Sequence, residues 1–234
     1  AASIIEERIY DAVPPFSTRR KYKDLVLKNG MRVLLVSDKK AFRETAALSV
    51  LGAGQFQEDS DLGGLAHLME HMVSSASVGR DFEDWLSDRD GASNAFTAPS
   101  LVCYHFNTPT DVFQESLLRF SQLFQQDAVE KACQNDSILR REIRRVNEEL
   151  SFDDESVQAF YLIKSIVNQD HPFSRFTQGS KDSLETSPSS RGINVKTRLT
   201  NFYETRYLAE RSVLVVVSRS DISTLEKWVE PFAI

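Results

Sequence analysis

The chain has 234 residues, of which 41% are hydrophobic and 26% are charged, and its formal net charge is −6. This composition is typical of one large or two small globular domains, and it argues against a largely disordered chain or a nucleic-acid-binding protein. The longest uniformly apolar run, Val213–Val217, is far shorter than the ~20 residues that a transmembrane helix needs, so no membrane span is expected.

Hydrophobic periodicity and turn residues divide the chain into short strands and helices. Asn29-Gly30 separates the first two strands, and this dipeptide favours positive φ at both central positions of a hairpin turn. In chain order, the sequence predicts an irregular segment at 1–20; strands at Tyr22–Lys28, Met31–Asp38 and Glu44–Leu51; helices at 62–76 and Phe82–Arg89; strands at Asn94–Thr97 and Leu101–Thr108; helices at Asp111–Gln126, 129–150 and 155–168; an extended surface loop at 169–192; a helix at 193–207; a strand at Ser212–Ser218; and a last helix at 222–230.

The order of these elements predicts the fold class. Strands come early and once late, and helices cluster in the middle of the chain. This order favours an α+β fold in which helices pack on one face of a mostly antiparallel sheet. Because no shift in composition marks a second domain, we interpret residues 1–21 as an N-terminal extension and residues 22–234 as a single domain.

The two cysteines, Cys103 and Cys133, are too few for a disulfide framework and are not spaced as C-x-x-C. We interpret both as buried thiols in a reducing compartment, which favours a cytoplasmic location. The chain begins at Ala1 without a secretory signal. A targeting segment removed from the chain would instead indicate a mitochondrial or plastid location.

The segment His67-Leu68-Met69-Glu70-His71 contains the pattern H-x-x-E-H within the helix predicted at 62–76. Residues four positions apart project from the same face of a helix, so both imidazoles can bind one Zn²⁺ ion at ~2.0–2.1 Å. Glu70 lies on the same face, one step away, where it can act as a base beside the metal. H-x-x-E-H is the inverzincin pattern.

A catalytic zinc usually takes three protein ligands and a water, so one ligand must come from elsewhere in the chain. Glu142 and Glu149 are seven residues apart and share a helix face, whereas Glu148 points about 100° away from Glu149. A Glu- and Arg-rich helix is also typical of a solvated face with ion pairs. Spacing therefore leaves Glu148 and Glu149 open as the third ligand, and we interpret His105 and His171 as structural residues.

Four blocks of sequence together resemble one family of zinc peptidases. They are His67–Met72, Ser93–Thr97, Arg141–Glu149 and His171–Ser180. With the late segment Thr224–Val229, they are similar to the pitrilysin/insulinase family, and within it to the insulysin and nardilysin group. The resemblance covers nearly the whole chain and implies a pitrilysin-type fold, a metalloendopeptidase activity and Zn²⁺ as the cofactor.

The resemblance also implies roles for individual residues. His67, His71 and Glu149 match the zinc ligands of the family, and Glu142 matches a glutamate that supports these ligands from behind. Glu70 matches the general base, which takes a proton from zinc-bound water and later passes it to the leaving amine.

Asn94, Ala95 and Phe96 match the edge strand to which family members bind a peptide as an additional strand, through main-chain hydrogen bonds. Family enzymes hydrolyse oligopeptides in a chamber that several homologous domains enclose, and this chain resembles the first of them. The implied partners are peptide substrates and the remaining domains of a full-length chain, with a homodimer left open. We therefore expect weak or absent turnover by this domain alone.

Two alternatives keep the same fold. One is a subunit similar to mitochondrial processing peptidase, which cleaves targeting presequences together with a partner. The other is a non-catalytic subunit similar to the core proteins of the cytochrome bc1 complex, a class that typically loses motif residues. The presence of His67, Glu70, His71 and Glu149, and the block His171–Ser180, favour the oligopeptidase.

Overall fold

A seven-stranded sheet forms the centre of the computed structural model, which describes residues 4–8, 20–76, 81–150 and 154–233. Neighbouring strands are antiparallel except β3 and β7, which run parallel. The predicted α+β class with a mostly antiparallel sheet is therefore confirmed. From edge to edge the strands are β1 (Ile4–Arg8), β2 (Lys21–Leu27), β3 (Arg32–Ser37), β7 (Ser212–Ser218), β4 (Glu44–Leu51), β6 (Leu101–Thr108) and β5 (Ala92–Thr97).

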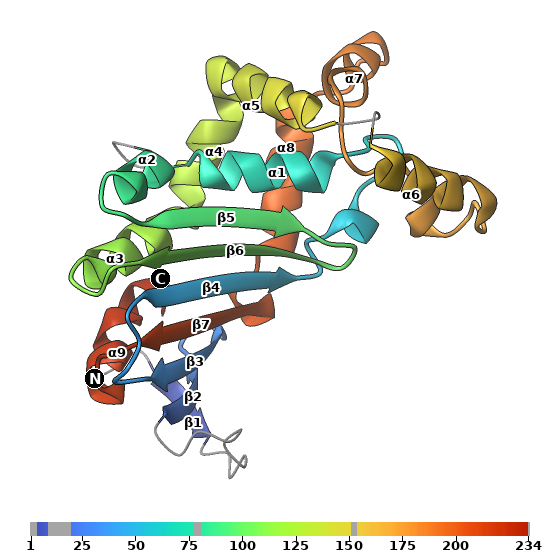
Figure 1. Cartoon of the computed structure of the whole chain (residues 1–234). Helices are drawn as coiled ribbons and strands as arrows, with labels where there is room; N and C mark the ends of the chain where they lie inside the picture. Colours follow the sequence, from blue (N-terminus) through green and yellow to red (C-terminus); the bar gives the residue numbers. More distant parts are fainter. Residues whose placement is uncertain (1–3, 9–19, 77–80, 151–153, 234) are drawn as a thin grey trace.

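Helices connect and cover these strands. Figure 1 shows α8 and α9 behind the sheet, and α1 alongside the edge that β5 forms. Among the described residues, no helix is both long enough and apolar enough to cross a bilayer. The helices are α1 (Leu65–Ser74), α2 (Phe82–Ser87), α3 (Phe113–Gln122), α4 (Gln126–Gln134), α5 (Asp136–Glu148), α6 (Glu155–Ile166), α7 (Ser187–Ser190), α8 (Val195–Arg206) and α9 (Ile222–Trp228).

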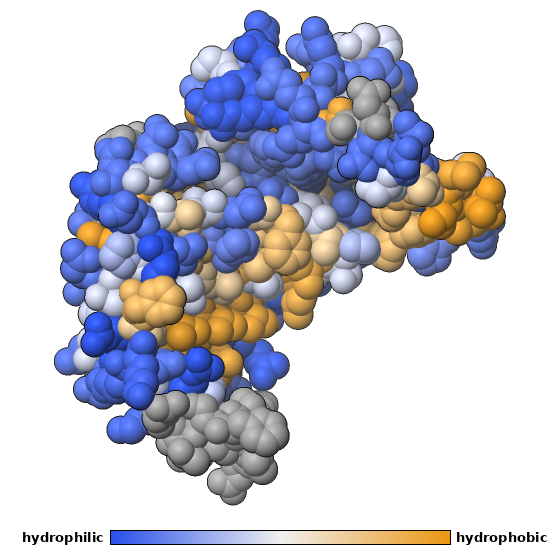
Figure 2. Space-filling view, in the orientation of Figure 1, coloured by the Kyte–Doolittle hydropathy of each residue, from blue (hydrophilic) through white to orange (hydrophobic). Residues whose placement is uncertain are grey.

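Alternating burial along the strands shows that the helices cover one face of the sheet. In β4, Ala46, Leu48 and Val50 are buried, while Thr45 and Leu51 are exposed. The opposite face stays partly open, and Figure 2 shows apolar surface there and over α6. The exposed large apolar side chains of α6 are Phe160, Leu162, Ile163 and Ile166.

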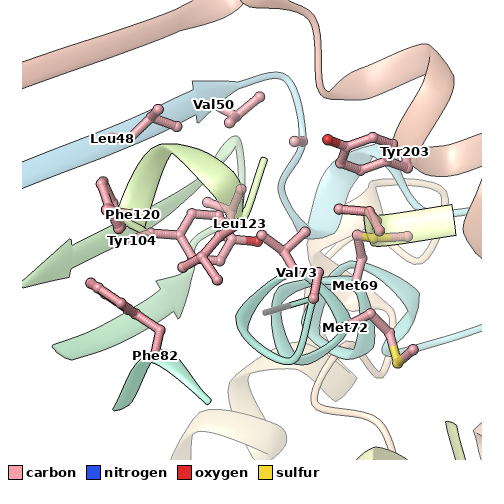
Figure 3. Packing of buried hydrophobic residues seen from close by; sticks show 14 of the residues in the cluster. Leu48, Val50, Met69, Met72, Val73, Phe82, Tyr104, Phe120, Leu123 and Tyr203 are labelled. Carbon is pink, nitrogen blue, oxygen red and sulfur yellow. The ribbon is translucent and has the colours of Figure 1, made fainter. Parts of the chain in front are cut away.

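The covered face of the sheet and the helices share one apolar core. Phe106 of β6 is buried in it, with its ring centroid 5.6 Å from that of Phe82 and 5.0 Å from that of Phe120. Aromatic pairs in such tilted and edge-on arrangements add about 0.5–1.5 kcal/mol each to the gain from area burial. Figure 3 shows part of this core, in which side chains of the sheet meet those of α1 and other helices: Leu48, Val50, Met69, Met72, Val73, Phe82, Tyr104, Phe120, Leu123 and Tyr203.

The first hairpin forms as predicted, but its turn differs in detail. The Leu27 carbonyl accepts from Gly30 N at 2.9 Å, and Leu27 N donates to the Met31 carbonyl at 2.9 Å. Gly30 has a φ of 88°, whereas Asn29 has no positive φ, so the prediction of positive φ at both central positions is wrong. Three residues, 28–30, therefore lie between the hydrogen-bonded residues Leu27 and Met31, and a single left-handed residue closes the loop. The Asn29 amide donates to the Phe232 carbonyl at 2.7 Å.

The start of the chain also differs from the prediction of an irregular segment at 1–20. Residues 4–8 form strand β1, which pairs with β2. Pro14 and Pro15, on which that prediction rested, lie outside the described residues.

Two later segments differ from the prediction as well. The helix predicted at 129–150 is divided at Asn135, whose backbone is extended and whose side chain caps α5 by accepting from Ser137 N. The segment 169–192 is more than a surface loop, because it contains α7 and buries Thr177 and Leu184.

Candidate metal centre

Helix α1 carries the H-x-x-E-H pattern along the β5 edge of the sheet (Figure 1). The helix begins after Gly64, whose φ of 93° turns the chain into its first residue. One face of α1 is apolar and nearly inaccessible to water, and it fixes the helix against the core: Leu65, Leu68, Met69 and Met72. The other face turns His67 and His71 towards α5, as the spacing predicts.

The two imidazoles are close together and partly buried, and each has a polar partner at its Nδ1 atom. Their ring centroids are 4.9 Å apart, and each side chain is 12% exposed. His67 Nδ1 lies 2.6 Å from the Gln178 carbonyl oxygen, and His71 Nδ1 lies 3.3 Å from Glu142 Oε2. Because a carbonyl and a carboxylate only accept hydrogen bonds, Nδ1 is the donor in both contacts, and each ring would present its Nε2 atom to a bound metal.

Glu149 faces both of these Nε2 atoms. Its Oε2 lies 3.2 Å from His67 Nε2, and its Oε1 lies 3.3 Å from His71 Nε2. Two ligand atoms bound to a tetrahedral zinc at ~2.0–2.1 Å are separated by about 3.3 Å. Each of these two nitrogen–oxygen distances therefore matches that between two atoms bound to one zinc ion, although the two contacts use different oxygens of Glu149. Glu149 is half-exposed, so one side of this site is open to solvent.

Glu70 is the fourth group near this point. A donor atom of Glu70 lies within 4.8 Å of donor atoms of His67 and His71, so distance alone would admit it as a ligand. However, Thr97 donates to Glu70 Oε2 at 2.6 Å, which holds the carboxylate towards β5, whereas Glu149 faces both imidazoles. Burial raises the pKa of Glu70 above its usual range, and the Thr97 hydrogen bond and the imidazoles oppose this shift. A carboxyl with a raised pKa suits a group that takes up and returns a proton.

Thr97 was not predicted as a site residue. Its only signal in the sequence is its place at the end of the block Ser93–Thr97, next to the residues expected to contact a substrate.

Glu142 is 1% exposed and lies behind His71. It also accepts from Arg141 Nε at 2.6 Å and from Arg145 Nη1 at 3.5 Å. Burial alone would raise the pKa of Glu142, but the hydrogen bonds from His71 and Arg141 and the arginine charges outweigh burial and lower it to about 2. The carboxylate is therefore charged at neutral pH and can orient His71. Burial lowers the pKa of His71, and the Glu142 hydrogen bond with the nearby carboxylates reverses that effect and raises it.

Glu142 supplies a prediction about the pH dependence of stability in the metal-free protein. Its pKa of about 2, against 4.5 for a free glutamate, means that the carboxylate stabilises the fold above about pH 4.5 and that this contribution is lost as the pH falls through about 2. The difference corresponds to about 3 kcal/mol. Urea unfolding of the parent and of Glu142→Gln should therefore differ by about this amount near neutral pH, and the gap should close towards pH 2.

The control for this prediction is Glu148→Gln, which changes an exposed carboxylate on the same helix. This variant should follow the parent protein at every pH. A gap between the parent and Glu142→Gln that keeps the same size from pH 7 to pH 2 would contradict the role given to the Glu142 charge.

A cleft with a volume of 580 Å³ adjoins these donors and is bounded by α1, α2 and β5. Asn94, Ala95 and Phe96, the predicted substrate contacts, all line it, and Phe96 is 51% exposed. Among the described strands, β5 pairs only with β6 and forms the edge of the sheet. Ala95 N donates to the Asn94 side-chain oxygen rather than to another strand. The cleft thus offers an extended chain an open strand edge beside the two histidines.

Comparison with known proteins identifies the fold and the family of this chain. The crystal structure of pitrilysin superposes on the whole of this chain with a TM-score of 0.85 and 26% sequence identity, and the match covers 24% of that chain. The fold is therefore pitrilysin-like. The family described as Insulinase (Peptidase family M16) matches residues 32–176.

Two curated relatives illustrate the similarity. "Insulin-degrading enzyme-like 1, peroxisomal" of Arabidopsis thaliana is 32% identical over 226 residues, which is 94% of this chain and 23% of that protein. "Insulin-degrading enzyme" of Homo sapiens is 31% identical over 217 residues, which is 90% of this chain and 21% of that protein. The chain belongs to the insulinase family of peptidases, and it spans less than a quarter of the length of these two relatives.

Proposed function

We propose that this chain carries the zinc site of a metalloendopeptidase that hydrolyses peptide bonds in oligopeptides. The observation that supports this proposal is the facing pair of contacts at 3.2 Å and 3.3 Å between the two histidine Nε2 atoms and the oxygens of Glu149. In this proposal His67, His71 and Glu149 hold the ion, and Glu142 orients His71 from behind. Zinc, when bound at such a site, lowers the pKa of water and polarises a carbonyl group as a Lewis acid.

Glu70 moves the proton in the proposed reaction. Thr97 donates to Glu70 Oε2, so the proton of the attacking water is taken up at Oε1. The same carboxyl later returns this proton to the amine that leaves when the peptide bond breaks. Burial of Glu70, which is 7% exposed, keeps bulk water from competing for the proton.

The substrate binds as an additional strand on the free edge of β5. Asn94, Ala95 and Phe96 line the cleft there, and main-chain hydrogen bonds to an edge strand do not depend on the side chains of the peptide. This mode suits a peptidase that accepts different oligopeptides. Because the chain spans 21–24% of the length of the three proteins compared above, we propose that further domains enclose the substrate and that the isolated chain turns over slowly.

Metal content and hydrolysis together test this proposal. The zinc-equilibrated chain should retain one zinc ion per molecule after dialysis, and His71→Ala should lose it. Cleavage of an unstructured peptide by excess protein over several hours, followed by mass spectrometry, should be slow in the parent and absent after removal of zinc by a chelator. A chain that binds no zinc at micromolar concentrations would contradict the proposal and would favour a non-catalytic subunit of the same fold.

A further inference from the structure

Lys164 is a buried charged residue that does not belong to the group of proposed metal ligands. Lys164 is only 4% exposed, although α6 otherwise presents several apolar side chains to solvent. The ammonium lies 5.1 Å from the ring centroid of Phe160 and 5.6 Å from that of Phe173. Burying an ammonium costs free energy unless its hydrogens have partners, so the contacts of Lys164 indicate what it does.

The partners of Lys164 lie on one short segment of main chain. Nζ donates to the Arg175 carbonyl at 2.7 Å and to Thr177 Oγ1 at 3.1 Å. The next residue, Gln178, places its carbonyl oxygen 2.6 Å from His67 Nδ1. The acceptors of the ammonium thus lie one and three residues before Gln178, whose carbonyl sets the tautomer and direction of His67.

The same segment is tied to the start of α1 by a second set of bonds. Arg175 Nη1 donates to the Glu58 carbonyl at 3.2 Å. The buried Glu58 carboxylate in turn accepts from Gly64 N and Ala66 N, each at 3.0 Å. Hydrogen bonds therefore fix both partners of the His67–Gln178 contact: the main chain before Gln178 on one side, and the start of α1, which carries His67, on the other.

The two histidines differ in how they are oriented. His71 is oriented by the side chain of Glu142, but His67 is oriented by a main-chain carbonyl. The position of a main-chain carbonyl is not set by the side chain of its own residue. It depends on the other residues that fix the backbone. Groups that orient a metal-binding histidine commonly change metal affinity about 10- to 100-fold when they are removed.

We propose that Lys164 is a positioning residue for His67, because its ammonium fixes the main chain of residues 175–178 and thereby the acceptor of the His67 Nδ1 proton. This inference rests on the proposed zinc site. It assigns to α6, which contributes none of the donor atoms named above, a role in metal affinity.

The zinc dissociation constant of the 234-residue chain, measured by competition with a chromophoric chelator, tests this proposal. Lys164→Met keeps the length of the side chain and removes its charge and donors, and it should weaken zinc binding about 10- to 100-fold. Thr177→Val, which removes one acceptor with little change of shape, should shift affinity less and in the same direction. Lys40→Met, at an exposed lysine between β3 and β4, is the matched control and should bind like the parent.

A second readout separates positioning from a general loss of structure. Long-range ¹H–¹⁵N spectra of the metal-free protein resolve the tautomers of its four histidines. In Lys164→Met the Nδ1-protonated signature of His67 should be lost, while that of His71 should persist. If Lys164→Met does not fold, Thr177→Val decides the question by the same two readouts.

The outcomes distinguish this inference from the proposed function. Parent protein that binds no zinc contradicts the proposed function. Parent protein that binds zinc, with folded Lys164→Met and Thr177→Val both within twofold of its affinity and an unchanged His67 tautomer, overturns only the role of Lys164. Equal changes at His67 and His71 also overturn it, because they would indicate a general effect on the fold.

Discussion

Replacing Glu70 with glutamine should leave zinc bound and lower peptide hydrolysis about 10²- to 10⁴-fold, the usual contribution of a general acid–base group. The amide has nearly the shape of the carboxylate, so it can still accept from Thr97 through its oxygen, but it cannot take up a proton. Neither histidine nor Glu149 is altered, so metal content should stay at one ion per chain. Hydrolysis under single-turnover conditions and zinc content, measured on the same sample, check both parts.

Glu83→Gln is the matched control for this experiment. Glu83 lines the same cleft from α2, and its side chain is exposed. The substitution removes one negative charge from the cleft without touching the proposed proton acceptor, so hydrolysis should stay close to the parent rate. If Glu70→Gln cleaved peptide at the parent rate with zinc bound, Glu70 would not be the base. If it lost zinc, Glu70 would belong among the metal ligands.

The part of this site that lies on α1 was predictable because its signals are local. An apolar stripe at helical spacing fixes which face of residues 65–74 enters the core, and the opposite face then carries His67, Glu70 and His71. Strand positions on the sheet were predictable for the same reason, since alternation decides which side chains of β4 are buried. These patterns depend only on a residue and its neighbours within one or two turns.

The choice between Glu148 and Glu149 was not predictable from spacing. α5 ends at Glu148, and Glu149 is the capping residue, with φ −74° and ψ −12°. Which of two adjacent carboxylates reaches the imidazoles depends on how α5 crosses α1, which no local pattern encodes. The family resemblance pointed to Glu149, and the structure places the Glu149 oxygens next to both rings.

The group that orients His67 was even harder to predict from the sequence. Gln178 is 111 residues away from His67 and acts through its main-chain carbonyl, a group that every residue has. Residues 169–192 looked like a surface loop because proline and glycine punctuate them, yet they bury Thr177 and Leu184 and pack against the start of α1. Proline and glycine residues predict that the backbone is irregular, but they do not predict whether it is exposed to solvent.

This segment approaches the start of α1 most closely where Gly179 lies against Gly64. Gly64→Ala should destabilise the protein by about 2–5 kcal/mol, which combines ~1–2 kcal/mol for a side chain at positive φ with ~1–3 kcal/mol for overpacking. Gly64 has φ 93°, and a Cβ there would overlap Gly179 Cα and lie 2.6 Å from Gly179 N. Because Gly179 follows the residue that holds His67, the variant should also bind zinc more weakly. Urea unfolding and chelator competition measure the two effects.

Gly192→Ala separates the two contributions. Gly192 has φ 70°, so alanine there meets the same backbone penalty, but no atom lies within 4 Å of the added Cβ. The control should therefore lose only about 1–2 kcal/mol and keep the zinc affinity of the parent. Equal destabilisation by the two substitutions would show that positive φ alone accounts for Gly64. A larger loss of unfolding free energy in Gly64→Ala than in Gly192→Ala, with weaker zinc binding in Gly64→Ala alone, would support the other explanation. In that case, contact between α1 and the segment after Thr177 maintains the geometry of the metal site.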